Sequence, residues 1–200
     1  MEKFGNDLDL AASILNNGGV IAFPTETVMG LGVIFDNEEA YKRLNIIKGR
    51  PESKPYTMML KDKKDIDKYA VVSTNARKLI DKYMPGPITL LLKAKDNVPG
   101  YVTHNTGVIG IRIPDHQELL ELLNKVGKPL LVPSANPSNQ PPAKTFSEVL
   151  VYFKQCLDYI IHNDAEGKAP STLVDIVNNE PVLLREGPIS LEDILNSIKE

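Results

Sequence analysis

Three cations lie close together where a predicted helix ends, in the segment Lys48-Gly49-Arg50-Pro51 with Lys54 beyond it. Arginine offers a planar fork to two phosphate oxygens and lysine a compact charge. These side chains could therefore hold a triphosphate and offset the charge that develops at its α-phosphorus. They could instead complement the negative end of the helix dipole. The chain has no G-x-x-x-x-G-K-[ST] motif, so the segment is not a Walker A loop.

Two polar loops follow predicted strands, the position at which open α/β sheets bind ligands. Thr25-Glu26-Thr27 brings two hydroxyls and a carboxylate ahead of two glycines, a set that could surround a small zwitterion. Pro133-Ser134-Ala135-Asn136-Pro137 is stiffened by its prolines and presents a hydroxyl and an amide that could bind phosphate, ribose or base edges. Each loop taken alone is also typical of an ordinary turn.

Three more polar positions lie in or beside predicted strands. Arg112 interrupts the apolar run Val108 to Ile113, and because a buried unpaired guanidinium is costly, it must meet an acid or a ligand. An internal salt bridge and a bound ligand are both compatible with this pattern. Ser171-Thr172 opens a later strand and Arg185-Glu186-Gly187 closes the next, and each is a weak signal alone.

Eight short runs have the length and composition of strands. Several are apolar without alternation, which is typical of strands that helices cover on both faces. Their spacing is too irregular for repeated β-α-β units, so we expect an α/β fold with a twisted, open, mixed sheet flanked by helices. The runs are Val20–Phe23, Thr57–Leu60, Ile88–Leu92, Val108–Ile113, Leu130–Val132, Tyr159–His162, Leu173–Val177 and Val182–Leu184.

Helical patterns lie before and between these runs. The first, through Leu8 and Leu15, ends at Asn17-Gly18-Gly19, and Thr145 with Glu148 has the spacing of a capping box. No flexible linker divides the chain, so a single domain over residues 1–200 is expected. N-terminal helix caps are predicted at Asp36, Thr74, Asp115, Thr145 and Ser190.

Composition narrows the classes of function. The net charge is -3, but the segment from Lys42 to Lys82 has twelve Lys or Arg against five Asp or Glu. This segment could hold a polyanion, or its lysines could form a solvated helix face. An RNA-binding module is therefore one alternative, although a net-acidic chain with only seven Tyr and five Phe argues against it.

The longest apolar run has only five residues, whereas about 20 are needed to cross a bilayer. The N-terminus lacks a signal-peptide pattern, so we expect a cytoplasmic protein without a membrane partner. Cys156 is the single cysteine, cannot form an internal disulfide, and is expected in the core. The three histidines have no metal-ligand spacing, so no metal site is expected.

In this order, the segments strongly resemble the YrdC-like threonylcarbamoyl-AMP synthase family in its single-domain form, from about residue 18 to residue 187. One such motif could arise by chance, whereas six or seven in sequence are very specific. The motifs are residues 24–32 (PTETVMGLG), 48–51 (KGRP), 85–89 (PGPIT), 110–116 (GIRIPDH), 133–136 (PSAN), 171–175 (STLVD) and 185–187 (REG).

The resemblance implies an L-threonylcarbamoyladenylate synthase, a nucleotidyltransferase that makes threonylcarbamoyl-AMP from L-threonine, bicarbonate or CO2, and ATP. The threonine amine forms a carbamate, whose oxygen attacks the α-phosphorus and releases pyrophosphate. The product serves N6-threonylcarbamoyladenosine formation in tRNA through a downstream transfer complex, and a weak direct tRNA contact is conceivable. A carbamoyl-adenylating enzyme that uses carbamoyl phosphate is the other alternative.

The resemblance also implies roles for individual residues. Thr27, Arg112, Ser171 and the backbone near Val132 would hold threonine, with Arg112 on its carboxylate. Lys48 and Arg50 would be catalytic, and Mg²⁺ would be carried mainly by the triphosphate. All these groups are expected to converge on one concave cationic surface. The residues expected around ATP are Lys48, Arg50, Lys54, Ser134, Asn136 and Arg185.

Two residues depart from the family pattern. Met29 stands where a tyrosine is usual, which removes a hydroxyl and a ring that could line the pocket. Asn139 stands where a glycine commonly follows the Ser-Ala-Asn loop. Because asparagine tolerates positive φ better than most residues, we expect the turn to survive this change.

Overall fold

The computed structural model describes residues 4–49, 56–167 and 169–199. The chain forms two compact units, each built from two stretches of sequence. Unit 1 contains residues 4–49 with 116–167, and unit 2 contains residues 56–115 with 169–199. The single domain expected over residues 1–200 stays a prediction.

Unit 1 is built on a mixed sheet. Strands β1, β9 and β2 are parallel, whereas β3 is antiparallel to both β2 and β8. The order across the sheet is β1 (Phe4–Gly5), β9 (Tyr159–Ile161), β2 (Ile21–Phe23), β3 (Gly30–Ile34) and β8 (Leu130–Val132). Every residue of β9, β2, β3 and β8 is buried, as expected for a sheet that helices cover on both faces.

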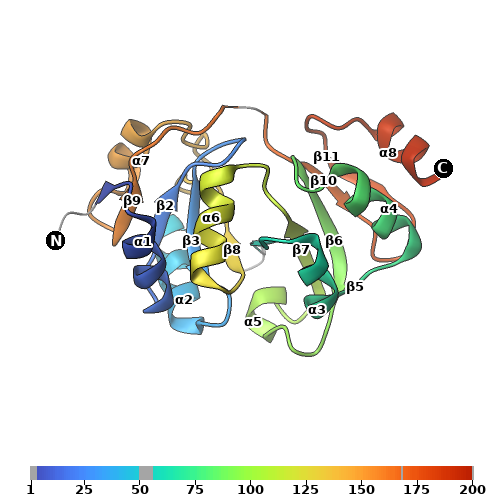
Figure 1. Cartoon of the computed structure of the whole chain (residues 1–200), viewed down its shortest axis with the longest axis horizontal. Coiled ribbons are helices and arrows are strands. Elements are labelled where there is room, and N and C mark those ends of the chain that lie inside the picture. Colours follow the sequence, from blue (N-terminus) through green and yellow to red (C-terminus); the bar gives the residue numbers. More distant parts are fainter. Residues whose placement is uncertain (1–3, 50–55, 168, 200) are drawn as a thin grey trace. The chain divides into compact units, whose positions relative to one another are not determined.

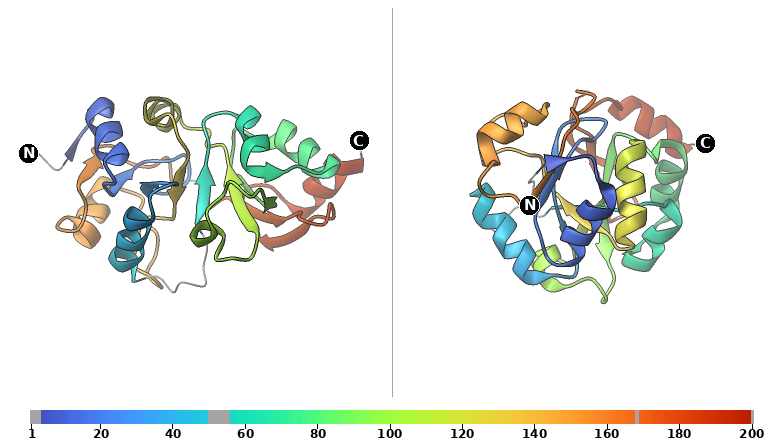
Figure 2. Two further views of the ribbon diagram at one scale, coloured as in Figure 1. Left: turned by 90° about the horizontal axis from the view of Figure 1, so that it is seen from below. Right: turned by 60° about the vertical axis from the view of Figure 1, so that its left-hand side comes forward.

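Four helices sandwich this sheet. Helices α1 and α6 pack together on one face, and α2 and α7 lie on the opposite face (Figures 1 and 2). Each contributes an apolar stripe, such as Leu119, Leu122 and Leu123 of α6, which are at most 1% exposed. The helices are α1 (Leu8–Asn16), α2 (Glu38–Lys48), α6 (Gln117–Val126) and α7 (Phe146–Phe153).

The strands of unit 2 also pair in a mixed pattern. Strand β7 is parallel to β4 and antiparallel to β6, while β10 is parallel to β6 and antiparallel to β11. The order is β4 (Thr57–Met59), β7 (Val108–Arg112), β6 (Ile88–Ala94), β10 (Thr172–Asp175) and β11 (Val182–Arg185), and β5 (Ala70–Val71) pairs with the end of β6. The mixed α/β pattern predicted from the sequence is thus confirmed in each unit.

Helices α4 and α8 pack against each other in unit 2 (Figure 1). The hydroxyls of Tyr83 and Ser197 lie 2.7 Å apart across this contact. Lys78 donates a hydrogen bond of 2.8 Å to the carbonyl of Ile198, which joins the C-terminal helix to the unit. The helices are η1 (Lys63–Asp65), α3 (Ile66–Tyr69), α4 (Thr74–Tyr83), α5 (Gly100–Thr103) and α8 (Leu191–Lys199).

The predicted capping box of α7 is confirmed. The amide of Glu148 donates to the Thr145 hydroxyl at 3.2 Å, and the amide of Thr145 donates to the Glu148 carboxylate at 3.1 Å. Ser190 also accepts from the amide of Asp193 at 3.1 Å in the first turn of α8, as its predicted capping role requires.

Three other predicted caps are wrong by one residue. Asn37, not Asp36, accepts the Ala40 amide, because the carboxylate of Asp36 lies 2.7 Å from the ammonium of Lys128. The observed cap of α4 is Ser73 instead of Thr74, and that of α6 is His116 instead of Asp115. At all three sites the residue with extended backbone takes the capping role.

Two further expectations need correction. Residues 30–34 form strand β3, although the predicted turn extended to Gly32. The ring of Phe23 lies where a Cβ of Gly32 would be, so the glycine allows two strands to pack closely. Cys156 is exposed and does not lie in the core, because it follows the end of α7 in a surface turn.

Candidate active site

The predicted site residues that the structure describes fall into two clusters, one in each unit. Arg50 and Lys54 lie outside the described residues. The convergence of both clusters on one concave cationic surface stays a prediction. The cluster of unit 1 comprises Thr27, Lys48, Val132, Ser134 and Asn136, and the cluster of unit 2 comprises Arg112, Ser171 and Arg185.

Lys48 is the last residue of α2, and its side chain turns into the protein. Gly49 ends the helix in the left-handed conformation, with φ 56°. Only 2% of Lys48 is exposed, and its ammonium donates hydrogen bonds of 2.6 Å to the carbonyls of both Ser134 and Asn136. A third oxygen, Oδ1 of Asn136, lies 3.3 Å away. The three N–H donors thus match three oxygens of one loop.

The loop after β8 is held by its own side chains as well. The hydroxyl of Ser134 donates to Oδ1 of Asn136 at 2.6 Å. The amide nitrogen of Asn136 donates to the carbonyls of Pro137 and Gln140 at 3.0 and 2.7 Å. Both amide donors of Asn136 are used within the loop, so Asn136 shapes the loop. Because Ser134 gives its hydrogen to Asn136, the Ser134 oxygen has lone pairs that can act as acceptors.

The loop after β2 fixes the hydroxyl of Thr27. Thr25 donates to the carbonyl of Val28 at 2.7 Å and accepts from the amides of Thr27 and Val28. The hydroxyls of Thr25 and Thr27 lie 3.0 Å apart. Thr25 thus holds the hydroxyl of Thr27 in place, and either of the two hydroxyls can be the donor of this contact. A threonine hydroxyl oxygen can accept from an ammonium group.

Backbone hydrogen bonds connect the two loops of unit 1. The amide of Ala135 donates to the carbonyl of Met29 at 2.7 Å, and the amide of Leu31 donates to the carbonyl of Pro133 at 3.0 Å. Gly30 and Ser134 form an antiparallel bridge. The structure thus places the first motif beside the end of β8, where Val132 lies, and beside the loop that Lys48 holds.

In unit 2, Ser171 is the centre of a hydrogen-bond cluster in which the two hydroxyls are buried and Arg185 is exposed. Its hydroxyl lies 2.9 Å from that of Thr89. Arg185 donates to the carbonyl of Ser171 from Nε at 3.1 Å and from Nη2 at 2.8 Å, and Nη2 also reaches the hydroxyl at 3.1 Å. Ser171 is 4% exposed and Thr89 is 2% exposed, so both hydroxyls are shielded from water.

The positive charge of one arginine in this cluster lowers the pKa of the other. Arg112 ends β7 and is 4% exposed. Burial lowers the pKa of Arg185, and the positive charge of Arg112 lowers it further. An anion bound between such groups would offset both effects, so the cluster favours a carboxylate or phosphate ligand.

Gly187 allows the Arg185 segment to approach Ser171. A Cβ on Gly187 would collide with the backbone nitrogen of Thr172 and would lie 2.5 Å from the carbonyl oxygen of Pro170. These are backbone atoms, which cannot swing aside. The glycine of the Arg185-Glu186-Gly187 motif therefore has a steric role in placing the arginine.

Sequence reasoning gave Thr89 no role, although it lies within the quoted 85–89 motif. The available signal was a hydroxyl within the apolar run Ile88–Leu92. Such a residue on a buried strand needs a hydrogen-bond partner. That partner is Ser171, whose distance from Thr89 in sequence hides the pairing.

A family model named Sua5_yciO_yrdC, described as Telomere recombination, matches residues 13–187. The chain belongs to this family. Its relatives include the threonylcarbamoyl-AMP synthase of Pyrococcus abyssi, which is 33% identical over 96% of this chain and 57% of its own length. The synthase of Bacillus subtilis is 34% identical over 92% of this chain and 54% of its own length. This chain thus spans little more than half of these two relatives.

Solved structures of the Sua5/YciO/YrdC family confirm the fold class. The crystal structure of P. abyssi Sua5 complexed with L-threonine has a TM-score of 0.91 at 33% identity, covering 96% of this chain and 57% of that chain. The crystal structure of Escherichia coli YciO has a TM-score of 0.88 at 27% identity, covering 97% of this chain and 100% of that chain. The family therefore has members that are named as synthases. It also includes YciO, whose whole chain is matched and whose name states no activity.

The two departures from the family pattern have structural outcomes. Met29 is 0% exposed, so its side chain belongs to the core of unit 1. Asn139 has φ 69°, which confirms that asparagine keeps the left-handed turn where glycine is common. The loop that holds Ser134 and Asn136 therefore keeps its turn.

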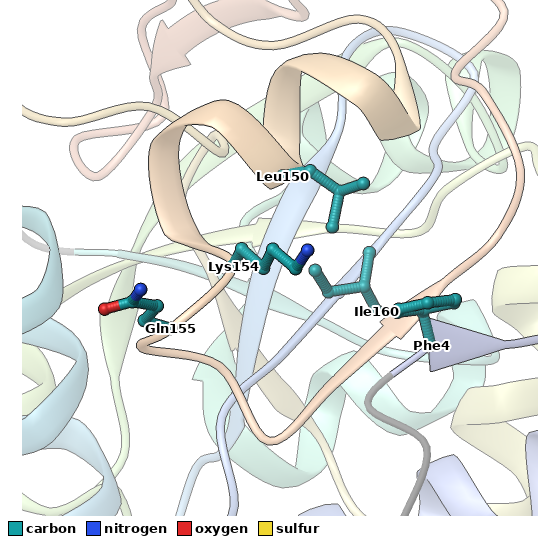
Figure 3. A pocket seen from close by; sticks show the side chains of 5 residues that line it. All are labelled: Phe4, Leu150, Lys154, Gln155 and Ile160. Carbon is teal, nitrogen blue, oxygen red and sulfur yellow. The ribbon is translucent and has the colours of Figure 1, made fainter.

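A surface pocket of about 370 Å³ lies in unit 1 (Figure 3). Among its described lining residues, none is a predicted site residue and Lys154 alone is a cation. A triphosphate would find too few partners there. The pocket is lined by Phe4, Leu150, Lys154, Gln155 and Ile160.

Many of the cations between Lys42 and Lys82 form surface ion pairs within their own unit. Arg43 bonds Asp158 at 2.5 Å, and Arg77 bonds Asp67 at 2.6 Å. Lys42 and Lys68 also pair with nearby carboxylates. These pairs favour the solvated-surface interpretation over a polyanion site. Among residues 4–49, 56–167 and 169–199, no helix is both long and apolar enough for a membrane span.

Proposed function

We propose that this chain makes L-threonylcarbamoyl-AMP from L-threonine, bicarbonate or CO2, and ATP, as a nucleotidyltransferase in threonylcarbamoyl modification of a tRNA adenosine. The observation that carries the proposal is the match at 33% identity and TM-score 0.91 to P. abyssi Sua5 complexed with L-threonine. The two polar clusters support it, because they supply the groups that an amino acid and a triphosphate need.

The reaction requires no covalent link to the protein. The threonine nitrogen attacks CO2 and loses a proton, which gives a carbamate. A carbamate oxygen then attacks the α-phosphorus of ATP, and the bond to the β-phosphate oxygen breaks to release pyrophosphate. Catalysis in this scheme consists of positioning the reactants and stabilising charge.

The amino acid is assigned to groups of matching charge. The guanidinium of Arg112 and the hydroxyl of Ser171 bind the carboxylate of threonine. The hydroxyl of Thr27, which lies 3.0 Å from that of Thr25, accepts from the threonine amine. The backbone near Val132 completes the set as an additional hydrogen-bonding partner.

The nucleotide is assigned to the loop of Ser134 and Asn136, with Arg50, Lys54 and Arg185 on its phosphates. Lys48 stabilises this loop, because its ammonium donates hydrogen bonds to the carbonyls of Ser134 and Asn136. Among the described residues, no three His, Cys, Asp or Glu side chains gather as a metal site. Mg²⁺ enters bound to the triphosphate and water.

Product identification tests the proposal. Purified protein is incubated with ATP, Mg²⁺, ¹³C-bicarbonate and L-threonine, and the products are analysed by mass spectrometry. We expect one ¹³C atom in an adduct of threonine, a carbonyl group and AMP. Replacing bicarbonate and threonine by carbamoyl phosphate serves as the control. An adenylate formed only with carbamoyl phosphate would refute the proposal, as would the absence of every adenylate.

A further inference from the structure

Thr89 occupies the middle of a row of residues that crosses the sheet of unit 2. Continuing the antiparallel register of β6 and β7 by one pair places Thr89 opposite Arg112. On the other side, β10 pairs Leu173 with Thr89, and β11 pairs Arg185 with the same leucine. Directly opposed residues point to the same face of a sheet. Thr89 therefore lies in the row between the two arginines.

Ser171, the residue before β10, reaches the same face. It precedes Leu173 by two residues, and alternate residues of an extended chain share a face. This geometry explains the 2.9 Å distance between the hydroxyl oxygens of Thr89 and Ser171. A buried pair of hydroxyls can serve only to give each other a hydrogen-bond partner. Whether the pair also affects a ligand depends on which of the two hydroxyls is the donor.

The hydrogens in this cluster can be counted. A guanidinium only donates, so the contact of 3.1 Å from Arg185 makes the Ser171 oxygen an acceptor. If Ser171 also gave its one hydrogen to Thr89, none would remain for a ligand. If Thr89 donates instead, the hydrogen of Ser171 is free. An anionic ligand favours the second arrangement, because hydrogen bonds to a charged oxygen are stronger than neutral ones.

We propose that Thr89 is a positioning residue that orients the Ser171 hydroxyl as a donor toward the carboxylate of the bound amino acid. The inference rests on the proposed function and adds a residue that acts on the affinity for threonine. Thr89 itself does not touch the substrate in this account. It sets the hydrogen-bond direction of the neighbour that does.

Two substitutions separate this role from a packing role. Thr89→Val keeps the shape and removes the hydroxyl, while Thr89→Ser keeps the hydroxyl. We expect Thr89→Val to raise the KM for L-threonine about 10-fold. We expect kcat to change by less than about 2-fold, because the reacting atoms are unaffected. Thr89→Ser should restore the KM to within about 3-fold of the wild type.

A double-mutant cycle gives the decisive readout. In the Ser171→Ala background, Thr89→Val should have no further effect on the KM for threonine, because no hydroxyl remains to be oriented. Additive effects would overturn the inference. So would a normal KM in Thr89→Val, or a Thr89→Ser variant as impaired as Thr89→Val.

Thr103→Val is a matched control, because Thr103 is another buried threonine of unit 2 whose hydroxyl bonds the local carbonyl of Gly100. It should leave the KM for threonine unchanged. Calorimetric titration with L-threonine separates the two proposals. A wild type that binds threonine without forming an adenylate refutes the proposed function, while weaker binding by Thr89→Val still supports this inference. A wild type that binds no threonine overturns both.

Discussion

The ammonium nitrogen of Lys48 lies 2.6 Å from the carbonyl oxygen of Ser134, 86 residues later in the chain. The same nitrogen meets two oxygens of Asn136, so one buried cation holds three acceptors of a single loop. Removing the cation would leave these acceptors unsatisfied and would loosen the loop that is assigned to the nucleotide. We therefore expect Lys48 to affect catalysis through the shape of the loop.

Lys48→Met should lower kcat/KM by about 30- to 1000-fold, equivalent to about 2–4 kcal/mol of transition-state stabilisation. Steady-state pyrophosphate release measures this effect. Lys42→Met is the control, because Lys42 is exposed on the same helix in a surface pair with Glu38. Full activity in Lys48→Met would refute the assigned role, and equal losses in both variants would indicate a general defect of α2.

Arg112→Gln should raise the KM for L-threonine by about 10- to 100-fold, since it removes a buried charge from the carboxylate site. The KM for ATP should stay within about 3-fold of the wild type. Kinetics with each substrate varied in turn distinguish the two effects. Arg77→Gln removes a surface guanidinium of the same unit, paired with Asp67, and should alter neither value. A change confined to the KM for ATP would contradict this role and would assign Arg112 to nucleotide binding.

Gly187→Ala should weaken threonine binding and lower the free energy of unfolding by about 1–3 kcal/mol. The reason is steric, because the new Cβ would displace the backbone of residues 170–172 and with it Ser171. Urea titration and calorimetry measure the two effects. Gly127→Ala is the comparison, because Gly127 has φ 73° but no atom within 4 Å of an added Cβ, so it should destabilise without changing threonine binding. Unchanged threonine binding in Gly187→Ala would contradict the account.

The capping box of α7 predicts a pH-dependent stability. Hydrogen bonds from the amides of Lys144 and Thr145 lower the pKa of Glu148. Because the folded pKa lies below the unfolded value of about 4.3, the contribution of Glu148 is complete above that pH and is lost as the pH falls through the folded value. Glu148→Gln should thus have a lower Tm than the wild type at pH 7 and a smaller difference at pH 3. A difference that is constant with pH would contradict the assignment.

Local patterns predicted most elements of the fold. The apolar runs at Leu130–Val132 and Ile88–Leu92 are strands in the structure, and the capping box at Thr145 is observed. Residues 30–34 were missed as a strand because two glycines resemble a turn signal. Gly32 instead accommodates the ring of Phe23 on the neighbouring strand, a tertiary contact that the local sequence does not show.

The sequence could name candidate site residues but not the hydrogen bonds among them. Arg112 was a candidate because it interrupts an apolar run, whereas Ser171 and Arg185 were weak signals alone and were assigned from the family resemblance. The buried position of Lys48 under the Ser134 loop could not be predicted, since a lysine at a helix end is ordinarily solvated. Thr89 was missed because its partner is 82 residues away and becomes a neighbour only through the pairing of β6 with β10.

The central claim is that this chain couples threonine to the cleavage of ATP, and pyrophosphate release tests it most directly. Purified protein with ATP, Mg²⁺ and bicarbonate is measured with and without L-threonine. We expect release only when threonine is present, saturating with its concentration. Release at the same rate without threonine, or no release under either condition, would contradict the claim.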